Sequence, residues 1–284
     1  MPWERTPGAA GKWRLLRSVA AGYFRCGYEL PVIRRLFPFI LLLFASLESA
    51  AIRVVHVIVA LADNENQGIA KLPGAFGDGS SPAANLNWGA GRGMKSHFDW
   101  APEWQRLEAK RPDLPHILDR AVWKHRDSTI YVIADAYDGR SLRQATEDLL
   151  LFASGGGVGF VSLGGKVIPS GGGADLIAFL GHNGLMDHKI EKIFLPQKDV
   201  PNEVIILAPI SRGFFANHIR ATGARPLLWT TGVLSSEAFT LREALIGWVA
   251  RETDEQIRER AAKGYDLYMK SGIAGARRLL VTGW

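Results

Sequence analysis

Five continuous apolar runs dominate the hydrophobic pattern of this sequence. Each run is rich in Val, Ile, Leu or Ala and stops at polar residues, proline or glycine; the runs span residues 53–62, 129–134, 176–180, 204–208 and 226–232. Unbroken apolar runs of this length predict strands that are buried on both faces, whereas a strand with one wet face shows alternation. A further strand is expected at residues 117–123.

Helical patterns lie between these runs. Residues 142–153 repeat apolar side chains at helical spacing, and a Ser141/Gln144 pair at their start has the form of a capping box. Further helices are expected at 214–221, from Ser235 and Ser236 to Trp248, and from a Thr253/Gln256 capping box towards Met269. A helical pattern also runs from Asn85 to Trp100, and residues 158–168 are expected to form an irregular strand or loop.

Strands that alternate with helices predict an α/β fold with a mainly parallel sheet and helices on both faces. We place one domain at residues 52–284, because no interior linker or internal repeat is visible. One long segment, residues 67–82, is rich in Gly, Pro and Asn. Loops of this length in compact domains are usually functional or disordered.

The net charge of +6 is concentrated at the N-terminus. Residues 1–36 carry seven Lys/Arg and two Asp/Glu, so the rest of the chain is nearly neutral. No basic stripe marks the body, and a nucleic-acid partner is therefore not expected. The chain has one cysteine, Cys26, in the N-terminal tail, which excludes an intrachain disulfide.

Residues 1–51 are predicted to form a basic tail and an export segment. Arg34 and Arg35 precede the apolar run 36–47, and small residues follow up to Ala51. This is the layout of a signal peptide cleaved near Ala50 or Ala51, with translation starting near Val32. The protein is then periplasmic or secreted. The alternatives are an uncleaved anchor, with membrane contact through residues 36–52 alone, and a buried core helix.

Polar residues follow the ends of the predicted strands. Ligands of open parallel sheets bind beyond the carboxyl ends of the strands. The candidate catalytic residues are therefore His182 and Ser211, and the candidate substrate-binding residues are Asp63, Asn64, Asp138, Asn183, Gly184 and Thr231. His182 stands out because an imidazole at the end of an apolar strand can act as an acid or base near neutral pH.

The sequence predicts no cofactor and no metal. His182, Asp187 and His188 do not have the spacing of a zinc site, and no second cluster completes them. The glycine-rich segments 155–159 and 164–166 lack the glycine spacing and the Ser/Thr of a phosphate-binding loop.

Two of the apolar runs, with the residues that follow them, resemble motifs of the caspase, legumain and gingipain type of cysteine peptidase. Residues 180–184, Leu-Gly-His-Asn-Gly, are similar to the His-Gly motif, and residues 206–209, Ile-Leu-Ala-Pro, to the motif with the nucleophile. The resemblance implies a caspase-like α/β fold with His182 as acid/base. Pro209 stands where such peptidases have their cysteine, and a prolyl side chain has no nucleophile.

Three functions follow from these observations. The first is an exported caspase-like pseudo-peptidase that binds a peptide or protein around His182. The second is an active hydrolase that uses His182 with Ser211, the hydroxyl nearest to Pro209 along the chain, or with an Asp such as Asp138. The third is a structural protein that the N-terminal segment anchors in a membrane.

Overall fold

Residues 51–284 are described by the structure, a computed structural model, and belong to one compact unit. Cys26, the basic tail and the apolar run 36–47 lie outside the described residues, so the predicted signal peptide or anchor cannot be followed there. Within 51–284, no helix has both the length and the apolar character needed to cross a membrane.

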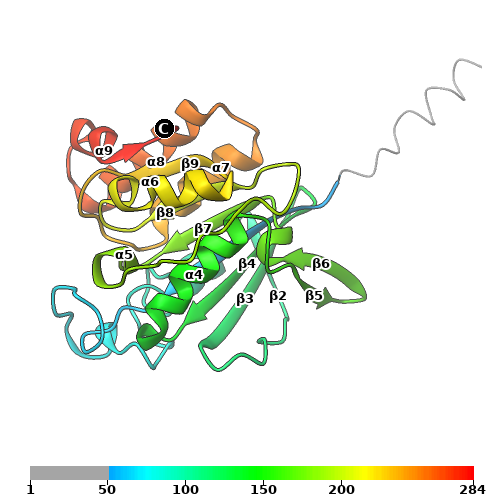
Figure 1. Cartoon of the computed structure of the whole chain (residues 1–284), viewed down its shortest axis with the longest axis horizontal. Coiled ribbons are helices and arrows are strands. Elements are labelled where there is room, and N and C mark those ends of the chain that lie inside the picture. Colours follow the sequence, from blue (N-terminus) through cyan, green and yellow to red (C-terminus); the bar gives the residue numbers. More distant parts are fainter. Residues whose placement is uncertain (1–50) are drawn as a thin grey trace, which may run out of the picture. The chain divides into compact units, whose positions relative to one another are not determined.

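An eight-stranded sheet forms the centre of the domain (Figure 1), in the order β10-β9-β8-β7-β1-β4-β3-β2. Five neighbouring strands are parallel: β4 (Ile130–Tyr137), β1 (Arg53–Ala60), β7 (Leu176–Leu180), β8 (Glu203–Leu207) and β9 (Arg225–Thr230). The predicted α/β class with a mainly parallel sheet is confirmed, and the five parallel strands coincide with the five apolar runs.

Antiparallel strands complete both edges of this sheet. On one side lie β3 (Ile117–His125) and β2 (Trp104–Leu107), and on the other the short β10 (Leu280–Val281). A separate hairpin consists of β5 (Gly159–Leu163) and β6 (Lys166–Ser170). The segment expected as an irregular strand or loop therefore contains two regular strands.

Helices cover both faces of the sheet. Successive β1 side chains point to opposite faces: Val55 and Val57 pack with α7 (Phe239–Val249) and α8 (Asp254–Met269), whereas Val54 and Ile58 pack with α4 (Leu142–Ala153) and α6 (Ser211–Thr222). In Figure 1, α4 and α6 lie in front of the sheet. Burial on two sides explains why β1 reads as a continuous apolar run.

The remaining helices are short. They are α3 (Met94–Asp99), α5 (Gly184–Asp187), α9 (Ile273–Leu279) and the 3-10 turns η1 (Gly74–Gly77), η2 (Gly139–Ser141) and η3 (Gly171–Gly173). The helical pattern over residues 85–100 thus corresponds to α3 alone. Of the aromatic side chains in this segment, Trp88 and Phe98 are buried in the core, whereas Trp100 is exposed.

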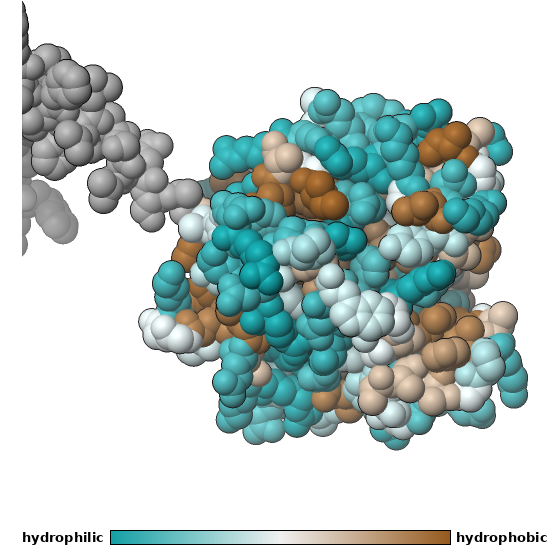
Figure 2. Space-filling view, turned by 180° about the vertical axis from the view of Figure 1, so that it is seen from behind, coloured by the Kyte–Doolittle hydropathy of each residue, from teal (hydrophilic) through white to brown (hydrophobic). Residues whose placement is uncertain are grey.

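Polar residues dominate the outer surface seen in Figure 2, with small apolar clusters between them. Part of this polarity comes from α8, where Glu259 pairs with Arg277 and Arg260 pairs with Glu252. Exposed ion pairs of this kind add little stability. They keep the outer face of a helix soluble while its inner face packs on the sheet.

The strand order reverses its direction between β1 and β7. After β1 the chain runs to the edge strand β2 and returns through β3 to β4, next to β1; after α4 it crosses to β7 on the other side of β1 and continues outward to β8 and β9. Side chains and loops diverge at such a switch point, which leaves a crevice beyond the carboxyl ends of the strands. The fold therefore predicts a ligand site next to the residues that follow β1 and β7.

Candidate functional site

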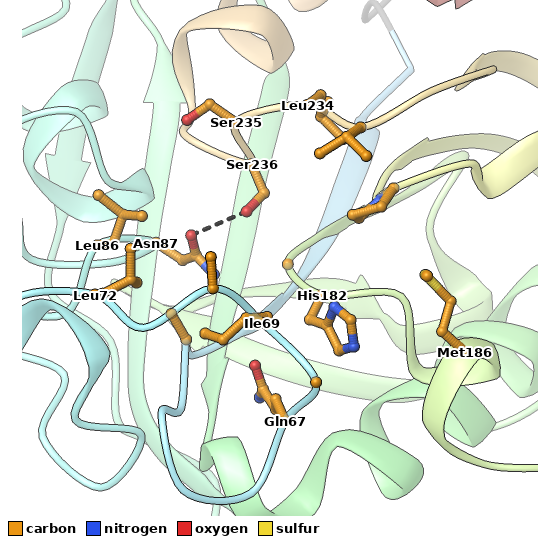
Figure 3. A pocket seen from close by; sticks show the side chains of 16 residues that line it. Gln67, Ile69, Leu72, Leu86, Asn87, His182, Met186, Leu234, Ser235 and Ser236 are labelled. Carbon is orange, nitrogen blue, oxygen red and sulfur yellow. Dashed lines mark hydrogen bonds between the residues drawn. The ribbon is translucent and has the colours of Figure 1, made fainter.

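A cavity of about 350 Å³ lies at this switch point (Figure 3). Its walls come from four segments that follow parallel strands, namely those after β1, β7, β8 and β9. The lining residues are Ala62, Gln67, Gly68, Ile69, Ala70, Leu72, Leu86, Asn87, Gly181, His182, Met186, Pro209, Val233, Leu234, Ser235 and Ser236. Its volume and mainly apolar wall are typical of small ligand pockets.

His182 is the predicted residue that the structure places in this cavity. Its side chain is 5% exposed, and its Nε2 lies 3.0 Å from Oδ2 of Asp187. The two groups are not oriented for a hydrogen bond, and Nε2 is buried without a hydrogen-bond partner. Because Nε2 has almost no accessible surface and lies against the Asp187 carboxylate, this nitrogen is not open to a ligand in the cavity as the structure stands.

The turn that carries His182 depends on two neighbouring residues. Gly181 has a φ of +143°, and a Cβ at this position would lie 2.8 Å from the carbonyl oxygen of Ala60. Asn183 is fully buried; its side chain accepts a hydrogen bond from Leu185 N and donates one of 2.7 Å to the carbonyl oxygen of Pro209. Asn183 thus ties the end of β7 to the end of β8 and fixes His182 beside Pro209.

The β8–α6 connection brings Pro209 into the same cavity and leaves Ser211 out of its wall. Ser211 is the first residue of α6 and is fully buried. Its hydroxyl donates to the carbonyl oxygen of Ile206 at 2.8 Å, accepts from Thr230 N at 2.9 Å and lies 3.1 Å from Thr230 Oγ1. These bonds hold α6 to β8 and β9, and they leave the hydroxyl no orientation towards the cavity.

Backbone strain marks the same connection. Ile210 has a φ of +50°, in the left-handed region that β-branched residues rarely adopt. Its amide donates a 2.9 Å hydrogen bond to the carbonyl oxygen of Gly232. The strained residue therefore links the segments after β8 and β9, both of which line the cavity. Local strain of this kind is concentrated at functional sites.

Asp63 and Asn64 shape the loop after β1 but do not line this cavity. The Asp63 carboxylate accepts hydrogen bonds from Glu65 N and from the backbone and side chain of Asn66. The Asn64 side chain bonds both the amide and the carbonyl of Leu72, each at 2.8 Å. Both residues thus hold in place the loop that presents Ile69 and Leu72 to the cavity.

The other three predicted binding residues have local contacts of their own. Asp138 caps η2 and pairs with the Arg140 guanidinium, which, with the Arg140 amide, holds the pKa of Asp138 below its usual value against the effect of burial. Gly184 packs against Thr146 so closely that a Cβ would lie 2.1 Å from its Oγ1. Thr231 donates to the carbonyl oxygen of Arg278 at 2.7 Å.

Most residues of the cavity wall gave no signal in the sequence. Gln67, Ile69 and Leu72 belong to the Gly/Pro/Asn-rich loop, whose length suggested function without naming residues. The segment 233–236 follows β9, and the sequence predicts that Ser235 and Ser236 cap the next helix. Neither Ser235 nor Ser236 caps α7, which begins at Phe239 after Ala238.

None of the residues that line the cavity is Asp, Glu, Lys or Arg. The polar side chains Gln67 and Asn87 are bonded within the wall: Gln67 Nε2 donates to the carbonyl oxygens of Leu61 and Gly139, and Asn87 Nδ2 to that of Ala60. Across residues 51–284, no three His, Cys, Asp or Glu side chains are grouped closely enough to hold a metal ion. The groups in this wall that could take part in chemistry are the His182 imidazole and the hydroxyls of Ser235 and Ser236.

No protein-family model, no curated protein and no solved structure matches this chain. The arguments about its function therefore start from the α/β fold and the cavity itself.

Proposed function

We propose that this chain is an exported, caspase-like domain that binds a peptide or protein segment in the cavity at His182 and lacks cysteine-peptidase activity. One observation carries the proposal: His182 and Pro209 both line a mainly apolar cavity beyond the parallel strands, and Pro209 occupies the place expected for a nucleophile. The parallel strand order and the placement of His182 after β7 are compatible with the resemblance seen in the sequence.

The binding role follows from what the cavity retains and what it lacks. Its wall is mainly apolar, and a hydrogen bond from Asn183 to Pro209 ties the ends of β7 and β8 together beside it. It lacks a thiol, and the Ser211 hydroxyl is held in bonds to β8 and β9. An acid/base without an activated nucleophile can bind and polarise a carbonyl but cannot form a covalent intermediate.

The test of this proposal measures peptide binding and peptide cleavage with the same purified protein. The full-length chain is incubated with a phage-displayed library of random peptides and, separately, with a diverse synthetic peptide mixture analysed by mass spectrometry. We expect peptide enrichment by the wild type, loss of that enrichment in His182→Ala, and no new peptide termini with either protein. Absence of any enriched peptide would overturn the binding proposal.

Hydrolysis with a serine nucleophile is a second candidate, favoured by one observation. The hydroxyls of Ser235 and Ser236 line the same cavity as His182, although Ser235 donates to Glu237 and Ser236 to Asn87. A nucleophile of this kind needs the imidazole within hydrogen-bond reach. Cleavage that disappears in both His182→Ala and Ser236→Ala would establish this function instead.

A further inference from the structure

The cavity at His182 also indicates which side chain its ligand inserts. This inference rests on the proposed binding function and concerns the chemistry of the bound segment. We propose that the cavity takes one uncharged, aliphatic side chain of an extended peptide.

The wall excludes a charged side chain. None of its lining residues is Asp, Glu, Lys or Arg, so neither an acidic nor a basic group would find a partner of opposite charge inside. The nearest carboxylate, on Asp187, already accepts a hydrogen bond from Gly68 N and lies beside His182. A charge buried without a partner is strongly disfavoured in an apolar environment.

Aliphatic side chains surround the cavity from several segments. Figure 3 shows Ile69 and Leu72 on the loop after β1, Met186 on α5 and Leu234 on the segment after β9. An unbranched thioether such as that of Met186 adapts to differently shaped aliphatic partners. Val233, which is 76% exposed, extends the apolar wall to the rim of the cavity. An aliphatic side chain that enters the cavity removes apolar surface of this wall from water, and this burial favours binding.

The polar side chains around the cavity are already engaged within the protein. Asn87 Oδ1 accepts the Ser236 hydroxyl, and Gln67 is bonded to the β1 loop, so both amides are already used. Nε2 of His182 has almost no accessible surface and lies 3.0 Å from Asp187 Oδ2. The wall therefore offers a bound side chain mainly apolar contacts.

A charge at the rim tests this assignment without disturbing the core. In Val233→Asp, a carboxylate replaces an exposed valine of the cavity wall. Val200→Asp is the matched control, because Val200 is 74% exposed and is not part of the wall. Each protein, as the full-length chain, is selected against the same phage-displayed random peptides, and the best peptide is resynthesised with its anchor residue changed to Asp, Lys or Ala.

We expect wild-type peptides that share one aliphatic position, and about tenfold weaker binding when that position becomes Asp, Lys or Ala. Val233→Asp should weaken binding of the aliphatic peptide to a similar degree and improve binding of the Lys peptide, whereas Val200→Asp should change neither. Enrichment of peptides with a charged anchor would overturn this inference and leave the binding function standing. No enrichment by the wild type would overturn both.

Discussion

At the scale of single residues, Gly181 determines where the imidazole of His182 lies. Its φ of +143° belongs to a region in which L-residues are strained, and its Cα faces the backbone of Ala60 on the neighbouring strand. The close approach of β7 to β1 at their carboxyl ends therefore requires a residue without a Cβ. A glycine beside a histidine was visible in the sequence, but the strand it approaches was not.

Gly181→Ala is expected to lower the free energy of unfolding by about 2 kcal/mol, because the new Cβ adds both backbone strain and a clash with Ala60. Gly275→Ala is the control: Gly275 lies in α9, and nothing is within 4 Å of its added Cβ. That substitution should be neutral or slightly stabilising. Urea denaturation measures both, and equal effects would contradict the role of Gly181.

His97 is a second residue whose environment predicts a measurable effect. Burial and the nearby Arg242 and Arg92 guanidinium groups lower its pKa to about 4, although Glu103 acts in the opposite direction. The unfolded chain therefore takes up a proton near pH 6.5, whereas the folded protein does so only near pH 4. Stability that is present above pH 6.5 should decrease as the pH falls through this window.

The variant His97→Gln removes this titration. We expect the wild type to lose stability relative to the variant as the pH falls from 6.5 to about 4. Above pH 7, the difference between their free energies of unfolding should be constant. Chemical denaturation at a series of pH values measures it. A difference that does not change with pH would show that His97 titrates normally in the folded protein.

At the scale of elements, two predicted capping boxes had different outcomes. Thr253 accepts from Gln256 N, and the Gln256 side chain bonds back to the Thr253 amide at 2.9 Å, so the box at the start of α8 is confirmed. Ser141 makes no such bond, because α4 continues directly from η2, which Asp138 caps. Whether this sequence pattern forms a capping box thus depends on the structure of the residues just before the helix.

These two helix starts form a matched pair for mutation. Thr253→Ala should lower the free energy of unfolding by about 1 kcal/mol, since it leaves amides of the first α8 turn without their acceptor. Ser141→Ala should have almost no effect, because no capping bond is lost. Thermal and urea denaturation of both variants measure the difference. A comparable loss in both would show that the Thr253 bond adds nothing.

At the scale of the whole molecule, a buried polar network joins segments that are distant in sequence. Asp135 on β4 accepts two 2.6 Å hydrogen bonds from Arg120 on β3 and lies 3.1 Å from Nε2 of His56 on β1. The Nδ1 of His56 accepts a 2.7 Å bond from Gly171 N in η3. The network therefore connects three strands with the turn that follows the β5–β6 hairpin.

Asp135→Asn should lower the free energy of unfolding by about 3 kcal/mol, because it leaves the largely buried Arg120 without its counter-charge. Burial alone would raise the pKa of Asp135, but the hydrogen bonds from Arg120 and His56 outweigh it and lower this pKa. The contribution is thus complete above about pH 4 and is lost as the pH falls below the unfolded-state value.

Denaturation at neutral and acidic pH checks this prediction, with Asp113→Asn as the control on an exposed loop before β3. The difference in free energy of unfolding between wild type and Asp135→Asn should become smaller as the pH falls below about 4. The control should have the wild-type free energy of unfolding at every pH. A gap that stays constant into acid would mean that the Asp135 carboxylate has no lowered pKa.

The sequence by itself determined the fold class, the five parallel strands and the main helices. A strand buried on both faces needs a continuous apolar run, and a helix that packs on a sheet needs apolar residues at a repeat near 3.6. Both patterns can therefore be recognised within a short stretch of sequence. It also singled out His182, because an imidazole one glycine beyond the buried run 176–180 can act as an acid or base near neutral pH.

Only the tertiary structure decided which residues meet at the cavity. Asp63, Asn64, Asp138, Gly184 and Thr231 all follow strands, as His182 does, yet their side chains or Cα atoms serve local turns and contacts. The wall instead comes from Ile69, Leu72, Met186 and Leu234, whose apolar side chains look alike in any loop. Their convergence depends on strand order and loop geometry, which are long-range properties of the chain.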